Sequence, residues 1–250
     1  MMPFRCLIVI PARYASTRFP GKPLHPIAGK PLVQHVWERG CQARLAAGVV
    51  IATDDERIAD AARAFGAAVA MTRGDHPSGT DRLAEVAAAF PDATHFLNVQ
   101  GDEPLINPAL LDQLIAVQHA DPLLPMITAA APLASAEDIA NPNIVKVVMT
   151  RAADALYFSR SPIPHARQPA ALPFYRHLGL YGYSREFLLQ FVVWPPSPLE
   201  TTECLEQLRA LENGARIRLV ITEDDSPGVD TPEQAAAVEE KILRLGAGLR

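Results

Sequence analysis

The stretch FRCLIVIPARYASTRFPGKPL, residues 4–24, decides the fold. Its first part, residues 4–10, is rich in β-forming apolar side chains and stops at Pro11, which predicts a buried strand. The long loop that follows carries Arg13, Arg18 and Lys22 among small and hydroxyl residues. In open α/β sheets, ligands bind beyond the carboxyl ends of the strands, so this loop is the first place to expect a ligand.

Apolar runs of strand length alternate with helical segments through the first half of the chain. Strands that alternate with helices in this way indicate parallel βαβ units and a doubly wound, mostly parallel sheet. The strands are predicted at residues 49–52, 67–71 and 95–99, and the helices at residues 31–46, 55–65, 80–90 and 108–119.

The pattern changes near residue 125. Strands are predicted at residues 127–131, 144–149 and 178–183, no long helix separates the first two, and prolines crowd residues 161–173. This pattern predicts a mixed or antiparallel subdomain at about 125–197, inserted into a single domain that spans residues 1–250. A helix at 198–212, a strand at 216–222 and a closing helix at 232–245 complete the prediction.

Composition narrows the class of protein. With 250 residues, 49% hydrophobic and 20% charged, the chain is typical of one well-packed α/β domain. A net charge of −5 argues against a general nucleic-acid binder. The three cysteines have no metal-binding spacing, and no apolar run has the length of a signal-peptide core or a membrane span. The sequence therefore predicts a cytoplasmic protein with no nucleic-acid or membrane partner.

The basic loop after the first strand is the first candidate site. Arg13, Ser16 and Lys22, with free backbone N–H groups, are suited to cradle a triphosphate. Any one arginine there is more typical of a solvated loop, but the cluster at a strand end favours phosphate. The loop lacks the GxxxxGK[ST] pattern of a P-loop.

A second candidate is HPSGTDR, residues 76–82. Ser78 and Gly79 precede a predicted helix, and such small residues allow a nucleotide base to lie close to the backbone. Taken alone, the motif is better explained by Ser78 or Thr80 as a helix N-cap.

Two acidic motifs are candidates for a metal site. In NVQGDEP, residues 98–104, a buried strand delivers Gln100 and Asp102 to the sheet edge; in GVDTPEQ, residues 228–234, Asp230 precedes a helix. Carboxylates are the ligands that Mg²⁺ prefers, and together the two aspartates would complete a magnesium site. The alternatives are a turn aspartate beside Gly101 and a helix cap at Asp230.

The second half of the chain holds polar residues suited to a sugar acid. Arg160, Arg176 and His177 are candidates to bind a carboxylate, and Glu206 and Gln207 to bind hydroxyls. Tyr181 and Tyr183 share one face of a strand, where packing explains them equally well.

These motifs, taken in order, resemble the CMP-Kdo synthetase family, also called 3-deoxy-manno-octulosonate cytidylyltransferases. The resemblance covers nearly the whole chain, and its specificity lies in the ordered set. The matching segments are PARYASTRFPGKPL, HPSGTDRLAEV, NVQGDEP, NPNIVKVV, ALYFSRSPIP, RHLGLYGY, PSPLE with LEQLR, and GVDTPE.

The resemblance implies a nucleotidyltransferase fold, a homodimer, and transfer of CMP from CTP to the anomeric hydroxyl of 3-deoxy-manno-octulosonate (Kdo) with Mg²⁺, for lipopolysaccharide synthesis. The loop at 165–173 is shorter than in the family, which leaves lid and dimer details open. The resemblance implies that CTP is bound by Arg13, Ser16, Lys22, Ser78, Gly79, Arg82 and Gln100, and that the metal is bound by Asp102 and Asp230. It implies that the sugar is bound by Gln100, Arg160, His177, Tyr181, Glu206 and Gln207. The implied catalytic residues are Arg13, Lys22, Asp102 and Asp230.

Three alternatives stay open from the residues alone. The same reaction with another sugar acid, such as a sialic acid, would differ in the sugar pocket. A catalytically silent nucleotide-sugar-binding protein would not need to keep Arg13, Lys22, Asp102 and Asp230 together. A glycosyltransferase would use Asp102 where such enzymes carry a DxD segment.

Overall fold

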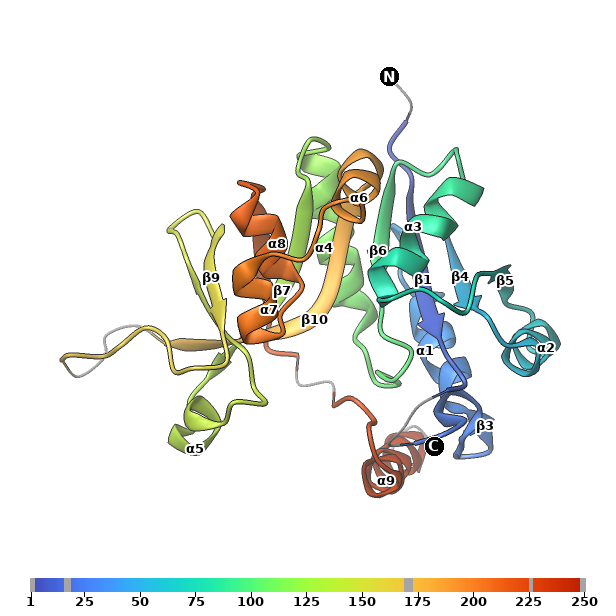
Figure 1. Ribbon diagram of the computed structural model, residues 1–250. Helices are drawn as coiled ribbons and strands as arrows, with labels where there is room; N and C mark the ends of the chain where they lie inside the picture. The colour runs from blue at the N-terminus through green and yellow to red at the C-terminus, as the bar shows by residue number, and fades with distance from the viewer. Residues whose placement is uncertain (1–2, 16–18, 169–172, 225–226, 248–250) are drawn as a thin grey trace.

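Strand β1, Cys6–Ala12, lies in the middle of a nine-stranded sheet. It pairs in parallel with β4, Gly48–Thr53, and with β6, His95–Asn98, and β4 pairs in parallel with β5, Ala68–Met71. These parallel pairings confirm the predicted parallel sheet, whose main strand order is β11-β7-β10-β6-β1-β4-β5 (Figure 1).

The computed structural model describes residues 3–15, 19–168, 173–224 and 227–247.

Both faces of β1 are buried, which explains why its sequence is a continuous apolar run. Leu7 and Val9 enter one core cluster, with residues of α3, Gly79–Ala89. Ile8 and Ile10 enter the cluster on the other face, with residues of α1, Leu32–Gly40, α2, Glu56–Ala64, and α4, Pro108–Ala120. This is the two-sided helical cover that the doubly wound prediction requires (Figure 1).

Helix α1 ends earlier than the predicted residue 46. It stops at Gly40, and the chain then turns so that the Ala47 N–H donates to the Cys6 carbonyl at 2.8 Å. That bond leads the chain into β4 beside β1, and a longer helix would have carried it past this position.

The stretch predicted as an inserted subdomain supplies strands to the same sheet. Strand β10, Phe174–Ser184, runs antiparallel between β6 and β7, Met126–Leu133, and β11, Ile217–Ile221, pairs in parallel with β7. Between β7 and β10 lie α5, Ala136–Ala140, and a hairpin of β8, Lys146–Met149, and β9, Ala155–Ser159. In Figure 1 this hairpin extends away from β6 and β1. The sugar-binding and dimer-forming role of the stretch stays a prediction.

The single helix predicted at 198–212 is wrong. After α6, Arg185–Phe191, the chain forms α7, Pro198–Glu203, and α8, Gln207–Glu212, separated by a break. Cys204 adopts a left-handed backbone with φ 52°, and the Leu205 side chain turns into the core. The break leaves Glu206 directly before α8, facing α3 instead of lying inside a helix.

The last helix, α9, Pro232–Ala247, packs against the loop that follows β1. That loop contains the short elements η1, Lys22–Leu24, β2, Pro26–Ile27, and β3, Lys30–Pro31. Ala235 and Val238 of α9 share a small core with Ile27 and Leu32, and Glu239 accepts a 2.7 Å hydrogen bond from the Ala28 N–H. The loop after the first strand thus meets the last helix at the carboxyl edge of the sheet.

Within the described ranges, no helix combines the length and the apolar character that crossing a bilayer requires.

Candidate active site

One lysine joins the two aspartates that the sequence predicts as metal ligands. The Lys22 ammonium lies 2.7 Å from Asp102 Oδ2 and 3.3 Å from Asp230 Oδ1. The Lys22 side chain is 16% exposed, against 29% for Asp102 and 44% for Asp230, so the cluster opens to solvent on its acidic side. The loop after β1, the loop after β6 and the start of α9 therefore converge on one point.

Close backbone packing holds these three loops together. A Cβ atom added at Gly101 would lie 2.7 Å from the Pro11 carbonyl oxygen, so only glycine lets the loop after β6 approach the end of β1. The Val229 N–H donates to the Asp102 carbonyl at 2.8 Å. Gly21, with φ 70°, donates its N–H to the Tyr14 carbonyl at 3.0 Å and turns the chain into the Lys22 position.

Arg13 connects the loop after β1 to the start of α3. Its guanidinium donates to the carbonyls of His76, at 2.8 Å, and Ser78, at 3.2 Å. Ser78 caps α3 and forms a capping box with Asp81, so the N-cap explanation holds for this residue, and Gly79 begins the helix. Ser16 and Arg18, also in the predicted phosphate loop, lie outside the described residues.

Arg82 is a residue of α3 and is buried, with 0% of its surface exposed. Its guanidinium lies 3.0 Å from Asp54 Oδ1 and donates to the Thr72 hydroxyl. Burial lowers its pKa, and the Asp54 carboxylate opposes that effect. In this structure the side chain that was predicted to bind CTP supports the loop before α3 from inside the protein.

Several of the predicted sugar-binding residues line β10 and its neighbours. Gln100 Nε2 donates to the Gly179 carbonyl at 3.4 Å, and the rings of His177 and Tyr181 lie 5.2 Å apart. Desolvation lowers the pKa of His177 to about 3, and the Thr128 hydroxyl lies 2.9 Å from its Nε2. His177 is therefore a neutral hydrogen-bonding group at neutral pH, not a cation for a carboxylate.

Arg160 is held by the chain around it. Its Nε donates to the Glu203 carbonyl at 2.7 Å and its Nη1 to the Pro142 carbonyl at 3.0 Å. Beneath it, the fully buried Lys146 donates to the Arg160 carbonyl at 2.5 Å and to the Ile144 carbonyl at 2.7 Å. Lys146 was not predicted to have a role; the only signal in the sequence was a lone lysine within the apolar segment NPNIVKVV.

Glu206 and Gln207 lie where α8 begins. Glu206 Oε2 accepts a hydrogen bond from the Thr80 hydroxyl of α3 at 2.6 Å, a contact that the sequence analysis missed. Gln207 is 3% exposed, and its Nε2 has no hydrogen-bond partner among the described residues. The Glu206 carboxylate thus faces α3, and the Gln207 side chain is buried.

Arg176 lies apart from the Lys22 centre. It lines a cavity of about 350 Å³ near the ends of β7 and β11, and it donates to the Asp224 carbonyl at 3.2 Å. The structure therefore brings Lys22, Asp102 and Asp230 into direct contact, ties Arg13 to Ser78, and leaves Arg176 in a separate hollow.

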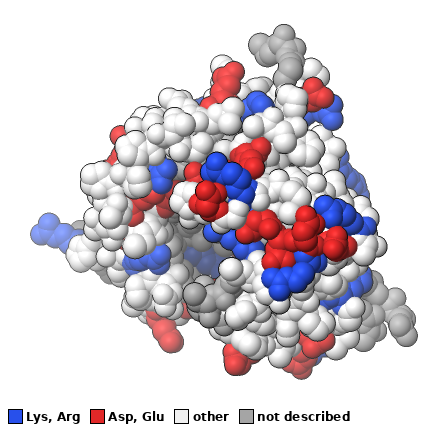
Figure 2. Space-filling view, turned by 45° about the vertical axis from the view of Figure 1, so that its right-hand side comes forward, with Lys and Arg blue, Asp and Glu red and all other residues white. Residues whose placement is uncertain are grey.

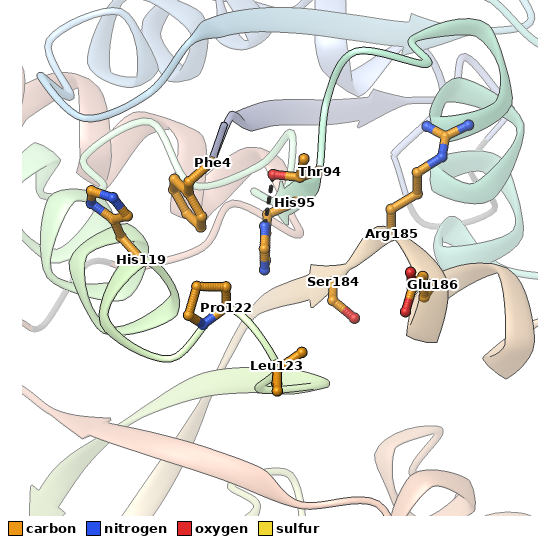
Figure 3. Close-up of a pocket in the computed structure, with 9 residues that line it drawn as sticks. All are labelled: Phe4, Thr94, His95, His119, Pro122, Leu123, Ser184, Arg185 and Glu186. Atoms are coloured by element: carbon orange, nitrogen blue, oxygen red, sulfur yellow. Dashed lines mark hydrogen bonds between the residues drawn. The ribbon is translucent and has the colours of Figure 1, made fainter. Parts of the chain in front are cut away.

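A larger cavity, of about 700 Å³, lies at the opposite end of the strands (Figure 3). It includes His95, the first residue of β6, whereas Asp102 follows the last. In Figure 3 the Phe4 ring stands between His95 and His119, with ring centroids 4.5 and 4.7 Å away. No residue of this cavity was predicted as a site residue.

The surface charge is uneven despite the acidic net charge. On the face drawn in Figure 2, Lys and Arg side chains lie inside a central hollow, while Asp and Glu side chains gather beside it. Such local basic groups are what an anionic ligand needs on an acidic protein.

Asp102 and Asp230 fit a magnesium ion. Both carboxylates reach the single ammonium of Lys22, so they converge on one point of positive charge. Among the described residues, no group of three or more His, Cys, Asp or Glu is placed to hold a metal. Mg²⁺ commonly takes one or two carboxylates and completes its shell with substrate phosphates, which suits this pair.

Comparison with known proteins relates this geometry to function. The family model described as cytidylyltransferase matches residues 7–217. A 3-deoxy-manno-octulosonate cytidylyltransferase of Geobacter metallireducens is 54% identical over 248 residues, covering 95% of this chain and 97% of its own. A 3-deoxy-manno-octulosonate cytidylyltransferase of Syntrophotalea carbinolica is 54% identical over 246 residues, covering 95% of this chain and 98% of its own.

Solved structures also resemble this chain. A CMP:2-keto-3-deoxy-manno-octonic acid synthetase complexed with CTP superposes with a TM-score of 0.93 at 45% identity, covering 96% of this chain and 99% of its own. A 4-diphosphocytidyl-2C-methyl-D-erythritol synthase from Anaerococcus prevotii, at 10% identity and a TM-score of 0.64, shares the fold and covers 96% of each chain.

Proposed function

This chain belongs to the 3-deoxy-manno-octulosonate cytidylyltransferases, and on that premise we propose that it transfers CMP from CTP to the anomeric hydroxyl of Kdo. The hydroxyl oxygen releases its proton to solvent and forms a bond to the α-phosphorus, the bond from that phosphorus to the bridging oxygen breaks, and pyrophosphate leaves. The observation that carries the proposal is the convergence of Lys22, Asp102 and Asp230 at the carboxyl edge of the sheet.

Arg13 and Lys22 supply the positive charge for the phosphates. A phosphoryl-transfer site works mainly by orienting the reactants and stabilising developing charge, without covalent help from the protein. Arg13 fixes the start of α3 by donating to the Ser78 carbonyl, directly before the helix. Lys22 is suited to leave its aspartate partners and pair with the departing pyrophosphate.

Asp102 and Asp230 are the residues that would hold Mg²⁺. When bound, the ion would neutralise phosphate charge and lower the pKa of an attached hydroxyl. For this reason no side chain is assigned as the general base.

A second set of residues is proposed to bind the sugar acid: Gln100, Arg160, His177, Tyr181, Glu206 and Gln207. Arg160 is the cation for its carboxylate, since the pKa of His177 is about 3. We further propose that the protein acts in the cytoplasm as a homodimer and that its product serves lipopolysaccharide synthesis.

Pyrophosphate release by the purified protein tests the proposal. The reactions contain CTP and Mg²⁺ with Kdo, with N-acetylneuraminate or with no sugar, and a parallel set contains EDTA. Release with Kdo alone, abolished by EDTA, is expected. Release with N-acetylneuraminate instead would change the sugar, and CTP binding without any release would favour a silent nucleotide-binding protein.

A further inference from the structure

Thr80 connects the proposed nucleotide and sugar sides of the cleft. It is the second residue of α3 and follows Ser78 and Gly79, yet its side chain turns inward and is 3% exposed. Its hydroxyl donates to Glu206 Oε2 at 2.6 Å, across 126 residues of sequence. A threonine at this position needs no such partner to begin a helix, because Ser78 already caps α3.

Glu206 accepts this hydrogen bond from Thr80 in addition to one from Ser78. The residue stands directly before α8, but its carboxylate makes no capping hydrogen bond to that helix. A glutamate side chain has several rotatable bonds, and fixing it before a ligand arrives removes an entropic cost from binding. A short hydrogen bond from a buried hydroxyl supplies that fixation.

We propose that Thr80 is a positioning residue whose hydroxyl fixes the Glu206 carboxylate and thereby sets the affinity for the sugar acid. The inference rests on the proposed function, in which Glu206 binds the sugar. Thr80 itself contacts no substrate in this scheme. It acts through Glu206, and its location in the first turn of α3 places the bond where the nucleotide side is also anchored by Arg13.

The charges around Glu206 give the inference a second readout. Burial raises the pKa of Glu206, while hydrogen bonds from Thr80 and Ser78 and the charge of Arg209 lower it. Asp81 of α3 also faces the carboxylate and raises its pKa, and Tyr181 and Tyr183 of β10 lie close enough to feel its charge. Removing the Thr80 hydroxyl is therefore expected to move the acid limb of kcat/KM for the sugar to higher pH.

The test compares Thr80→Val, which keeps the shape and loses the hydroxyl, with Thr80→Ser, which keeps the hydroxyl. Loss of a hydrogen bond to a charged group is expected to raise KM for Kdo about tenfold or more and to leave KM for CTP within about threefold. Thr80→Ser is expected to restore both KM for Kdo and the pH profile. Thr94→Val, at the opposite end of the sheet, removes another bonded hydroxyl and is the matched control.

Circular dichroism and thermal melting show whether each variant folds, and Thr80→Ala replaces Thr80→Val if the latter does not. A double-mutant cycle with Glu206→Gln adds an independent check, because a direct contact makes the two effects on KM for Kdo non-additive. If the wild type turns over Kdo but Thr80→Val keeps its KM and pH profile, or the cycle is additive, this inference alone is overturned. If the wild type releases no pyrophosphate with Kdo, the proposed function fails and the inference fails with it.

Discussion

Lys22 and Asp102 form an ion pair of 2.7 Å across 80 residues of sequence, at the edge of the sheet where β1 and β6 both end. The pair is only partly exposed, and Asp230 lies on its other side at 3.3 Å. The Lys22 ammonium is therefore held between two carboxylates at one point of the sheet edge.

Asp102→Asn is expected to lower kcat by at least about a hundredfold with Mg²⁺ present. A magnesium-ligating charge contributes several kcal/mol to the transition state, and ~1.4 kcal/mol corresponds to a tenfold change in rate. The measurement is pyrophosphate release at saturating CTP and Kdo, with the exposed Asp92→Asn as control. Turnover close to the wild-type value in Asp102→Asn would remove this residue from the metal site.

Asp54→Ala is expected to lower the free energy of unfolding by about 3 kcal/mol, because it leaves the guanidinium of Arg82 buried without its carboxylate. Urea denaturation measures the loss. Asp60→Ala, which breaks an exposed pair with Arg63, is the control and should cost less than about 0.5 kcal/mol.

The double variant Asp54→Ala, Arg82→Met is expected to recover part of that stability, since it removes both charges. If Asp54→Ala lowered the free energy of unfolding no more than Asp60→Ala does, the buried Arg82 guanidinium would not need the Asp54 carboxylate for stability.

Glu103 is expected to make stability fall as the pH rises toward 8. Burial and the neighbouring charges of Asp102 and Asp224 raise its pKa to about 8, against an ordinary value of 4.5. Between these values the folded state holds a proton that the unfolded state has lost, so this contribution is full below pH 4.5 and is lost through pH 8.

Glu103→Gln should therefore be more stable than the wild type at pH 8 by roughly 1–3 kcal/mol and nearly equal to it at pH 5. Denaturation in EDTA at both pH values measures the difference, with the exposed Glu137→Gln as control. An equal effect of Glu103→Gln at pH 5 and pH 8 would contradict the raised pKa.

His177 is expected to make the protein sensitive to acid. Desolvation lowers its pKa to about 3, so below pH 6.5 the unfolded state takes up a proton that the folded state refuses. Stability should fall as the pH drops from 6.5 toward 3, and His177→Gln, which keeps a hydrogen-bonding group beside Thr128, should reduce that fall by roughly 1–3 kcal/mol. Urea denaturation at pH 5.0 and 7.5 measures the free energy of unfolding, with His165→Gln as control. An equal loss of stability between the two pH values in His177→Gln and the wild type would refute the prediction.

The strand runs and the loops between them were predictable, because a buried parallel strand leaves a continuous apolar segment in the sequence. Residues 95–99 and the structural β6 differ by one residue, and Asp55 was correctly placed at the start of α2. The acidic motifs themselves predicted the pairing of Asp102 with Asp230, and the family resemblance added Lys22 to the catalytic set. The contact of all three depends on how distant loops pack.

The break at Cys204 was not predictable from propensity. A left-handed conformation there is imposed by the burial of Leu205 and the connection to α8, and cysteine carries no local signal for it. The contacts of Arg82, Lys146 and Thr80 were not predicted for the same reason, since each involves partners far away in sequence. Spacing along the chain does not reveal such partners.

The convergence of Lys22 with Asp230, 208 residues apart, also fixes when the centre comes into existence during synthesis. A ribosome that has released β1, β4, β5 and β6 has delivered Lys22 and Asp102 but not the second carboxylate. The strands that pair with β1 on both sides are thus synthesised well before the residue that completes the contact of Lys22 with two carboxylates. A chain that ends before residue 230 contains both residues of the Lys22–Asp102 pair but lacks the second carboxylate that contacts Lys22.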